Sequence, residues 1–310
     1  MVVYKLKVLL TEMCIFMGLA ILLSFNLPGN TLMKKAPFYK IGHRGTRGLM
    51  PENTIQAMTK AIEMGCNTIE MDIHITKDGQ VLVYHDESFN PDYTLMPDGS
   101  EIAPADRKKY TFYQMNYADI RKFVIGKKKY AAFPQQQQME CYAPLLTELI
   151  DSVENHTKTH KVKAVNYLIE IKSNPQTDGF EQPAPEVLVD KLMSVLKPHK
   201  LGSRLIIQSF DIRPLKVLHQ KYPKVTLGFL TGDAKVSMKK NLADLGFNPD
   251  FYNPHYGMVT AQMVDTYHSQ NMLITPWTVN ELKEMKQVKD LNVDGIITDY
   301  PNFLTDLLKQ

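Results

Sequence analysis

The stretch Glu70-Met71-Asp72-Ile73-His74-Ile75 alternates polar and apolar residues without interruption. Side chains of a β-strand point alternately to its two faces, so this period predicts a strand with Glu70, Asp72 and His74 on one face. Two neighbouring carboxylates repel each other unless a cation or a proton lies between them. The pattern is therefore typical either of a solvated face of an edge strand or of a divalent metal site.

Two histidines that flank this stretch favour the metal site. The strand-like run Tyr39-Lys40-Ile41-Gly42 precedes His43-Arg44-Gly45, and Val81-Leu82-Val83-Tyr84 precedes His85-Asp86. Two imidazoles, a guanidinium and two carboxylates are thus expected at consecutive strand ends, which is where α/β barrels build their active sites. The sequence predicts one polar site at the mouth of such a barrel.

The motifs of this region resemble those of the glycerophosphodiester phosphodiesterase family. They are His43-Arg44-Gly45, Pro51-Glu52-Asn53-Thr54, Glu70-x-Asp72, Thr76-Lys77-Asp78-Gly79 and His85-Asp86, then Glu170-Ile171-Lys172, Trp277-Thr278-Val279-Asn280 and the closing stretch 294–301. The resemblance covers almost everything after about Lys40 and implies a TIM barrel that hydrolyses glycerophosphodiesters to glycerol 3-phosphate and an alcohol. It also implies that a neighbouring hydroxyl of the substrate attacks the phosphate, giving a cyclic phosphate that water later opens.

Strand and helix patterns alternate along the rest of the chain, as an α/β barrel requires. After the first two strands, further strands are expected at 167–172, 205–210, 225–230, 251–254, 272–277 and 295–298, and helices at 145–154, 186–196, 215–221, 236–245, 261–270 and 281–291. About eight strand-helix units result, the number that a closed (β/α)8 barrel needs. The barrel is placed at residues 36–310, and the stretch 51–54 is given a structural role in which Asn53 caps the first helix.

Residues 87–143 interrupt this alternation. Four prolines and the turn Asp98-Gly99 lie in this segment, together with aromatic residues such as Tyr110 and Phe123. The prediction is a small insertion after the second barrel strand, which caps the site and shapes the choice of substrate.

The N-terminal segment, residues 1–30, has a different character. Lys5 and Lys7 precede a mostly apolar run at 13–25, which predicts an export signal or an uncleaved anchor that tethers the protein to a membrane. The expected location is therefore periplasmic or extracellular. The two later cysteines, Cys66 and Cys141, are compatible with a disulfide and equally with two buried thiols.

Composition limits the classes of partner. A chain of 310 residues that is 44% hydrophobic supplies one large core, and its formal net charge of +3 is small. Its basic runs, 107–109 and 127–129, are short, and no basic stripe interleaved with aromatic residues is present. The composition therefore does not favour a nucleic-acid partner, and the family resemblance implies a small-molecule phosphodiester.

The residue types predict a division of roles at the site. Glu70, Asp72 and Glu170 offer oxygen ligands, which suit one Ca²⁺ or Mg²⁺ ion. His43 and His85 are expected to share the acid and base roles. A zinc site that uses these histidines is the alternative.

Arg44, Lys172 and Trp277 are the expected substrate-binding residues. Arg44 as a bidentate fork and Lys172 as a point charge would face the phosphate. The similar family places a hydrophobic wall for the glycerol or alcohol near Trp277, and a core or rim position is the alternative for this residue. Asp299 is expected to be a structural hydrogen-bonding residue at the last strand end.

Two other function classes are alternatives to this enzyme. A catalytically inactive binding protein would keep the barrel but lose histidines or carboxylates, and this chain lacks none of them. A phospholipase-type phosphodiesterase that acts on membrane lipids or lysolipids is the second alternative. An apolar rim around the mouth would favour it, whereas a small polar pocket would favour soluble glycerophosphodiesters.

Overall fold

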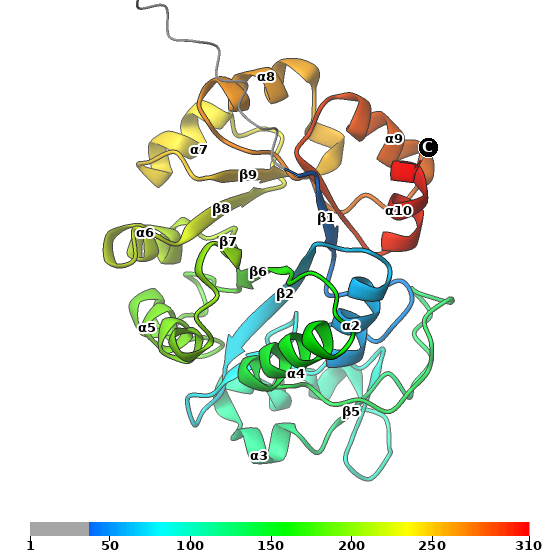
Figure 1. The fold of residues 1–310 in the computed structure, drawn as a ribbon. Helices are drawn as coiled ribbons and strands as arrows, with labels where there is room; N and C mark the ends of the chain where they lie inside the picture. The colour runs from blue at the N-terminus through cyan, green and yellow to red at the C-terminus, as the bar shows by residue number, and fades with distance from the viewer. Residues whose placement is uncertain (1–36, 310) are drawn as a thin grey trace, which may run out of the picture. The chain divides into compact units, whose positions relative to one another are not determined.

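The computed structural model describes residues 37–309. Its central element is a curled sheet of parallel strands in the order β10-β1-β2-β6-β7-β8-β9 (Figure 1). The strands are β1 (Tyr39–Gly42), β2 (Thr68–Ile75), β6 (Asn166–Ile171), β7 (Leu205–Ser209), β8 (Thr226–Thr231), β9 (Phe251–Pro254) and β10 (Gly295–Thr298). The first and last strands pair in parallel, with Tyr39 opposite Gly295. This pairing confirms the predicted TIM-barrel class.

Segment 272–277 occupies the eighth position of the ring, between β9 and β10. Leu273 forms a parallel bridge to β9, and the Ile274 carbonyl accepts a hydrogen bond from the Asp294 N–H beside β10. The predicted strand at 272–277 is irregular, since it is joined to β9 and to the residue that follows β9 by isolated bridges. Pro276 contributes to this because it has no N–H to donate. It nevertheless closes the barrel at the expected place.

Helices connect the strands and surround the ring (Figure 1). They are α2 (Ile55–Glu63), α4 (Leu146–Thr159), α5 (Pro185–Leu196), α6 (Ile212–Lys221), α7 (Met238–Leu245), α8 (Ala261–Ser269), α9 (Leu282–Asp290) and α10 (Pro301–Lys309), with short 3₁₀ turns η3 (Lys197–His199), η4 (Gly202–Arg204) and η5 (Tyr256–Met258). The sequence patterns predict all of the listed α-helices except α10.

The start of α2 corrects one expectation. Thr54 is the N-cap, because its backbone is extended and its side chain accepts a hydrogen bond from the Ala57 N–H. Asn53 has a positive φ of 57°, and its side chain donates to Asp72 instead. The predicted cap at Asn53 is therefore wrong by one residue.

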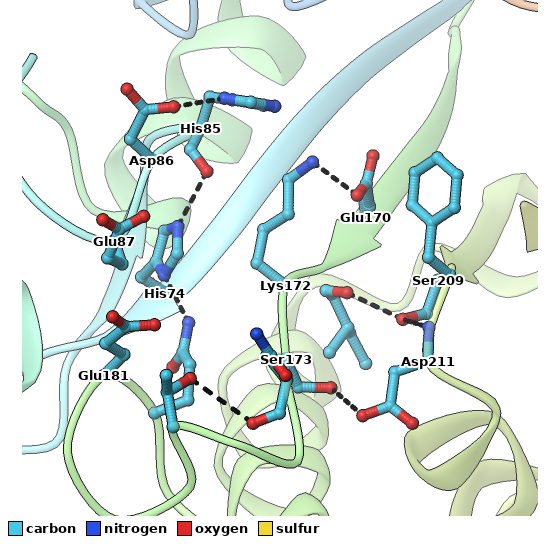
Figure 2. A pocket seen from close by; sticks show the side chains of 15 residues that line it. His74, His85, Asp86, Glu87, Glu170, Lys172, Ser173, Glu181, Ser209 and Asp211 are labelled. Atoms are coloured by element: carbon cyan, nitrogen blue, oxygen red, sulfur yellow. Dashed lines mark hydrogen bonds and ion pairs between the residues drawn. The ribbon is translucent and has the colours of Figure 1, made fainter. Parts of the chain in front are cut away.

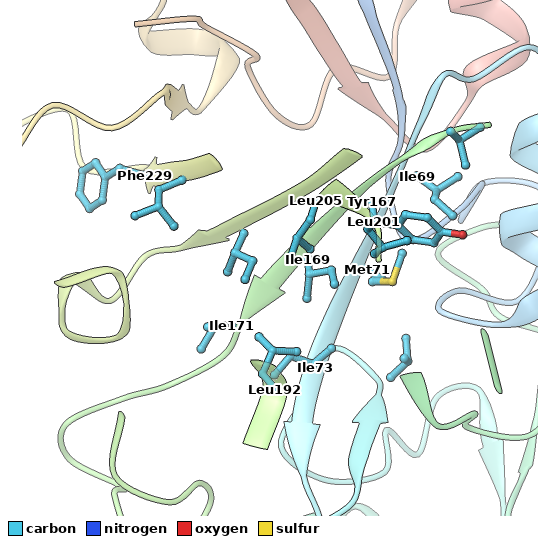
Figure 3. Packing of buried hydrophobic residues seen from close by; sticks show 14 of the residues in the cluster. Ile69, Met71, Ile73, Tyr167, Ile169, Ile171, Leu192, Leu201, Leu205 and Phe229 are labelled. Atoms are coloured by element: carbon cyan, nitrogen blue, oxygen red, sulfur yellow. The ribbon is translucent and has the colours of Figure 1, made fainter. Parts of the chain in front are cut away.

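Both faces of β2 are buried. The polar residues of its alternating pattern therefore face the inside of the barrel, not solvent, and the apolar residues face the surrounding helices. Residues that face outward pack against the helices in the main hydrophobic core (Figure 3). On β2 and β6 these include Ile69, Met71, Ile73, Ile169 and Ile171. Inside the barrel a smaller apolar layer consists of Ile41, Leu168, Ile206, Phe251 and Ile297. The solvated-edge interpretation of β2 is therefore wrong.

β3 (Val81–Val83) lies outside the barrel. It pairs antiparallel with the end of β2, where Val83 lies opposite Ile73. Gly79 turns the chain between the two strands with a φ of 79°, a conformation that glycine adopts without strain. The hairpin then continues directly into His85.

The chain between β3 and α4 forms a second hydrophobic cluster, which contains Tyr84, Phe89, Phe112, Phe123 and Cys141. Its elements are β4 (Thr94–Leu95), β5 (Val124–Ile125), α3 (Tyr117–Ile120), η1 (Pro104–Tyr110) and η2 (Phe112–Gln114). β4 and β5 pair antiparallel with each other. Apart from Leu82 and Tyr84, the buried residues of this cluster fall within the predicted insertion, 87–143, whose effect on substrate choice stays a prediction.

Two further expectations concern the cysteines and the N-terminus. Cys66 and Cys141 are free and buried, so the structure favours two thiols over a disulfide. The predicted signal or anchor at 1–30 lies outside the described residues. Within residues 37–309, no helix combines the length and apolarity needed to cross a bilayer.

Candidate active site

Three carboxylates from two neighbouring strands converge inside the barrel. Glu70 and Asp72 lie on β2, Glu170 lies on β6, and the register places Asp72 opposite Glu170. One oxygen of each carboxylate lies within 4.8 Å of the other two, and all three residues are buried. The structure therefore brings together the three predicted metal ligands.

These oxygen atoms fit a hard divalent cation. Oε1 of Glu70 is buried and has no hydrogen-bond partner within the described residues, and an unsatisfied buried carboxylate is costly. Burial, with Asp72 and Glu170 nearby, raises the pKa of Glu70 well above its ordinary value. A bound cation would offset both penalties, and an all-oxygen donor set suits Ca²⁺ or Mg²⁺ better than zinc.

Lys172 follows β6 and contacts the same cluster (Figure 2). Its Nζ lies 3.0 Å from Oδ1 of Asp72 and 2.5 Å from Oε1 of Glu170. Although burial opposes the charge, these carboxylates raise the pKa of Lys172 to about 12. The side chain is therefore an ammonium group at neutral pH.

Arg44 lies in the cluster as predicted, but two carboxylates already bind its guanidinium. Nη1 lies 2.7 Å from Oε1 of Glu52, and Nε lies 3.4 Å from Oδ2 of Asp72. The backbone N–H of Arg44 donates to Oε2 of Glu70 at 2.7 Å, from a residue with a φ of 47°. Arg44 thus holds the carboxylates in place as well as lining the cavity.

Glu52 and Asn53 are site residues, although the sequence predicts a purely structural role for them. Glu52 is buried and binds Arg47 through Oε2 at 2.6 Å as well as Arg44. Asn53 donates to Oδ2 of Asp72 at 2.8 Å and accepts from the Asp72 N–H at 3.3 Å. The motif Pro51-Glu52-Asn53-Thr54 was the available signal, since two of its four residues fix the cluster.

His43 forms a pair with a carboxylate from the other end of the chain. Its Nδ1 lies 2.6 Å from Oδ1 of Asp299, and Asn280 donates to Oδ2 of the same carboxylate at 2.8 Å. This pairing favours the tautomer with its hydrogen on Nδ1 and leaves Nε2 as a proton acceptor. Burial lowers the pKa of His43 below its ordinary value, although Asp299 opposes that shift.

His85 forms a second pair of the same kind. Its Nδ1 lies 2.6 Å from Oδ1 of Asp86, and Asn90 donates to Oδ2 of Asp86 at 2.9 Å. Burial disfavours the charged carboxylate, yet the hydrogen bond from His85 lowers the pKa of Asp86 to about 2. Neither His43 nor His85 belongs to the metal-ligand cluster found within residues 37–309, which disfavours the zinc alternative.

His74 shares the face of Glu70 and Asp72, as predicted, but supports the site from outside the cluster. Its Nε2 lies 3.0 Å from the His85 carbonyl oxygen (Figure 2), and the Gln182 side-chain amide contacts its Nδ1. Burial lowers the pKa of His74 to about 4. This neutral imidazole fixes the backbone of His85.

Two cavities meet at this cluster. The first chamber, about 250 Å³, is lined by His43, Arg44, Arg47, Leu230 and Trp277 among others. The second chamber, about 270 Å³, is lined by Asp86, Glu87, Glu181 and Asp211 among others (Figure 2). His85, Glu170, Lys172 and Phe210 line both chambers and form their shared wall.

The sequence predicts either a substrate-lining position or a core or rim position for Trp277, and the structure places its ring both at the rim and in the lining of a chamber. Its Nε1–H donates to the Asn253 carbonyl at 2.9 Å, which fixes the ring at the barrel rim. The same ring lines the first chamber and meets Phe210 edge-to-face, with 5.3 Å between ring centroids. Phe210 is 45% exposed, so an aromatic pair borders the mouth.

A closed parallel barrel with paired histidines and an acidic cluster at the carboxyl ends of its strands defines an α/β-barrel enzyme. A sequence model described as "Glycerophosphoryl diester phosphodiesterase family" matches residues 43–303. The chain belongs to this family, which confirms the resemblance inferred from its motifs and makes it a phosphoric diester hydrolase.

Individual relatives agree with this assignment. The glycerophosphodiester phosphodiesterase of Bacillus subtilis (strain 168) is 29% identical over 87% of this chain and 86% of that protein. A solved structure from Silicibacter pomeroyi DSS-3 is 26% identical and has a TM-score of 0.78, covering 88% of this chain and 94% of its own. An Oleispira antarctica phosphodiesterase in complex with the product sn-glycerol-3-phosphate is 20% identical, with a TM-score of 0.68 and coverage of 87% and 96%. This last match shows the fold alone.

Proposed function

We propose that this chain hydrolyses glycerophosphodiesters to glycerol 3-phosphate and an alcohol, by histidine acid-base catalysis with a divalent cation. One observation carries the proposal: two histidine–aspartate pairs and the three-carboxylate cluster surround the junction of two chambers. A phosphodiester joins two alcohols through one anionic phosphate. The phosphate would therefore lie at the shared wall, with one alcohol in each chamber.

The lining of the two chambers supports a division of the acid and base roles between the two histidines. His43 lines the first chamber only, and its lowered pKa keeps Nε2 free to accept a proton from the attacking hydroxyl of the substrate. His85 lies in the shared wall and donates a proton to the oxygen that leaves into the second chamber. Water then opens the cyclic phosphate with the two roles reversed. Each proton transfer is worth about 10²- to 10⁴-fold in rate.

The charge of the phosphate is met by groups on the shared wall. Lys172 places its ammonium there, held by Asp72 and Glu170. A divalent cation held by Glu70, Asp72 and Glu170 would supply further positive charge to stabilise the phosphate oxygens in the transition state. Arg44 orients Glu70 through its backbone N–H and Asp72 through its guanidinium.

The test is a hydrolysis assay with glycerophosphocholine, run with and without a chelator. His43→Ala and His85→Ala should each lower kcat by about 10²- to 10⁴-fold, and chelation should abolish activity that added Ca²⁺ or Mg²⁺ restores. His160→Ala is the matched control, because His160 is exposed at the end of α4, outside both chambers. Full activity in either active-site variant would defeat the histidine assignment.

A lysolipid substrate is the second candidate, and the aromatic pair at the mouth favours it. Phe210, at 45% exposure, leaves an apolar surface beside Trp277 along which an acyl chain could extend. Comparing kcat/KM for lysophosphatidylcholine and for glycerophosphocholine separates the two. If kcat/KM is higher for lysophosphatidylcholine, the lysolipid and not the soluble diester is the preferred substrate.

A further inference from the structure

The second chamber differs from the first in the charge of its walls. Asp86, Glu87, Glu181 and Asp211 contribute carboxylates to the second chamber in addition to the metal-ligand Glu170. Figure 2 shows Glu87 and Glu181 on one side, next to His74, while the Lys172 ammonium points toward Glu170. The first chamber is lined by the cluster carboxylates Glu70 and Glu170, by Arg44 and Arg47, and by apolar side chains such as Leu230 and Trp277.

Nearby cations do not balance these carboxylates. Arg107 lies 3.1 Å from Asp86 and 3.5 Å from Glu87, so one guanidinium serves two acids. Arg213 likewise contacts both Asp211, at 2.6 Å, and Asp178, at 2.5 Å.

The ammonium of Lys172 lies against Asp72 and Glu170 at the shared wall, so it does not pair with Glu87 or Glu181. The Glu181 side chain makes no ion pair or hydrogen bond within residues 37–309 and lines the cavity, only partly exposed. The chamber therefore carries a net negative charge, and Glu181 provides a carboxylate free to bind a ligand.

We infer that the second chamber binds the alcohol half of the substrate and selects cationic alcohols, such as ethanolamine and choline, through Glu87 and Glu181. The inference rests on the proposed function, because the alcohol leaves into this chamber only if His85 protonates it there. An ammonium group in this chamber gains from the unbalanced carboxylates, whereas a neutral alcohol gains nothing from them. Phe210 in the shared wall offers an aromatic contact to a quaternary ammonium.

The contrast between the chambers also fixes the orientation of the substrate. Among the described residues, the first chamber has no lining acid besides the cluster carboxylates Glu70 and Glu170, and Trp277 and Leu230 offer apolar contacts to the glycerol carbons. A diester with a cationic alcohol therefore binds in one direction, with its leaving oxygen toward His85. A diester of two glycerols lacks this preference.

The experiment compares kcat/KM of the full chain for glycerophosphocholine and glycerophosphoethanolamine with that for neutral glycerophosphoglycerol. The wild type should prefer both cationic substrates. Glu181→Gln and Glu87→Gln should each lower the ratio of kcat/KM for the cationic substrates to kcat/KM for the neutral substrate by about fivefold, the scale of a partly exposed ion pair. Added salt should weaken the preference of the wild type.

Glu186→Gln is the matched control, because Glu186 is exposed on α5 and lines neither chamber. Equal kcat/KM for cationic and neutral diesters in the wild type would overturn the inference while leaving the proposed function intact. An unchanged preference in both Glu87→Gln and Glu181→Gln would overturn it as well. Failure of the wild type to cleave any glycerophosphodiester would overturn the proposed function, and the inference with it.

Discussion

The substitution Glu52→Gln tests how the arginines beside the acidic cluster are held. Glu52 is 3% exposed and joins two guanidiniums, at 2.7 Å to Arg44 and 2.6 Å to Arg47. The Tyr93 hydroxyl also donates to Oε1 of Glu52, at 3.3 Å. Glutamine keeps the shape of the side chain, but it removes the charge and replaces one acceptor oxygen with an NH₂ group.

The structure sets the size of the expected effect. Removing one partner of a buried ion pair costs about 3–5 kcal/mol, because a charge is left buried without compensation. Arg44 keeps its contact with Asp72 at 3.4 Å, and Arg47 is the more exposed of the two arginines. A loss near the lower end, about 3 kcal/mol in the free energy of unfolding, is therefore expected.

Urea unfolding of the purified protein at pH 7 measures this loss. Glu140→Gln is the control, because Glu140 pairs with Lys127 at 3.2 Å where both side chains are more than 60% exposed. An exposed pair of this kind contributes less than about 1 kcal/mol. If Glu52→Gln cost no more than Glu140→Gln, the reasoning that Glu52 holds two buried arginines would be refuted.

The pH dependence of stability gives a second measurement of the same contact. Burial alone would raise the pKa of Glu52, but Arg44 and Arg47 lower it below the ordinary value. A lowered carboxyl pKa contributes stability above the pKa of the unfolded state, about 4.3, and this contribution is lost as the pH falls through the folded-state pKa. The wild type should therefore lose stability more steeply in acid than Glu52→Gln does.

Three further predictions follow from the histidines and thiols. Because burial lowers the pKa of His43, the acidic limb of kcat/KM should have its midpoint below the ordinary histidine value of about 6.5, and a midpoint above 6.5 in a pH–rate profile would contradict this. Asp299→Asn should reduce kcat by about 10²-fold or more, because the tautomer of His43 is no longer fixed, and steady-state kinetics at saturating substrate measure it. Burial raises the pKa of Cys66 to about 12 and that of Cys141 to about 11, so in a Cys14→Ser variant neither thiol should react with a disulfide reagent until urea unfolds the protein.

Strands and helices in which apolar residues recur at a regular spacing were predictable from the sequence. The alternation in 70–75 identified β2, and the run 295–298 has the bounds of β10. The irregular form of segment 272–277 was harder to predict, because its isolated bridges to β9 and to His255 depend on tertiary contacts. The cap of α2 was missed by one residue because Asn53 and Thr54 are both good capping residues, and only the backbone conformation distinguishes them.

Site residues were predictable where a motif repeated the same chemistry close together in sequence. Strand period predicts that Glu70 and Asp72 share one face of β2, and the pairing of β2 with β6 in the structure brings Glu170 to them. Asp299 was expected at the end of the last strand, but its pairing with His43 joins residues 256 positions apart. No local pattern shows such a contact, because it depends on the closure of the ring.

The pairing of β1 with β10 also has a consequence for synthesis of the chain on the ribosome. The partner of β1 begins only at Gly295, so the first strand is made long before the strand that completes its ladder. Until the C-terminal residues emerge from the exit tunnel, the nascent protein carries an open edge with unpaired amide and carbonyl groups. Chaperones that shield such edges would have their main opportunity during this interval, and a stop codon shortly before Gly295 would leave the edge permanently unprotected.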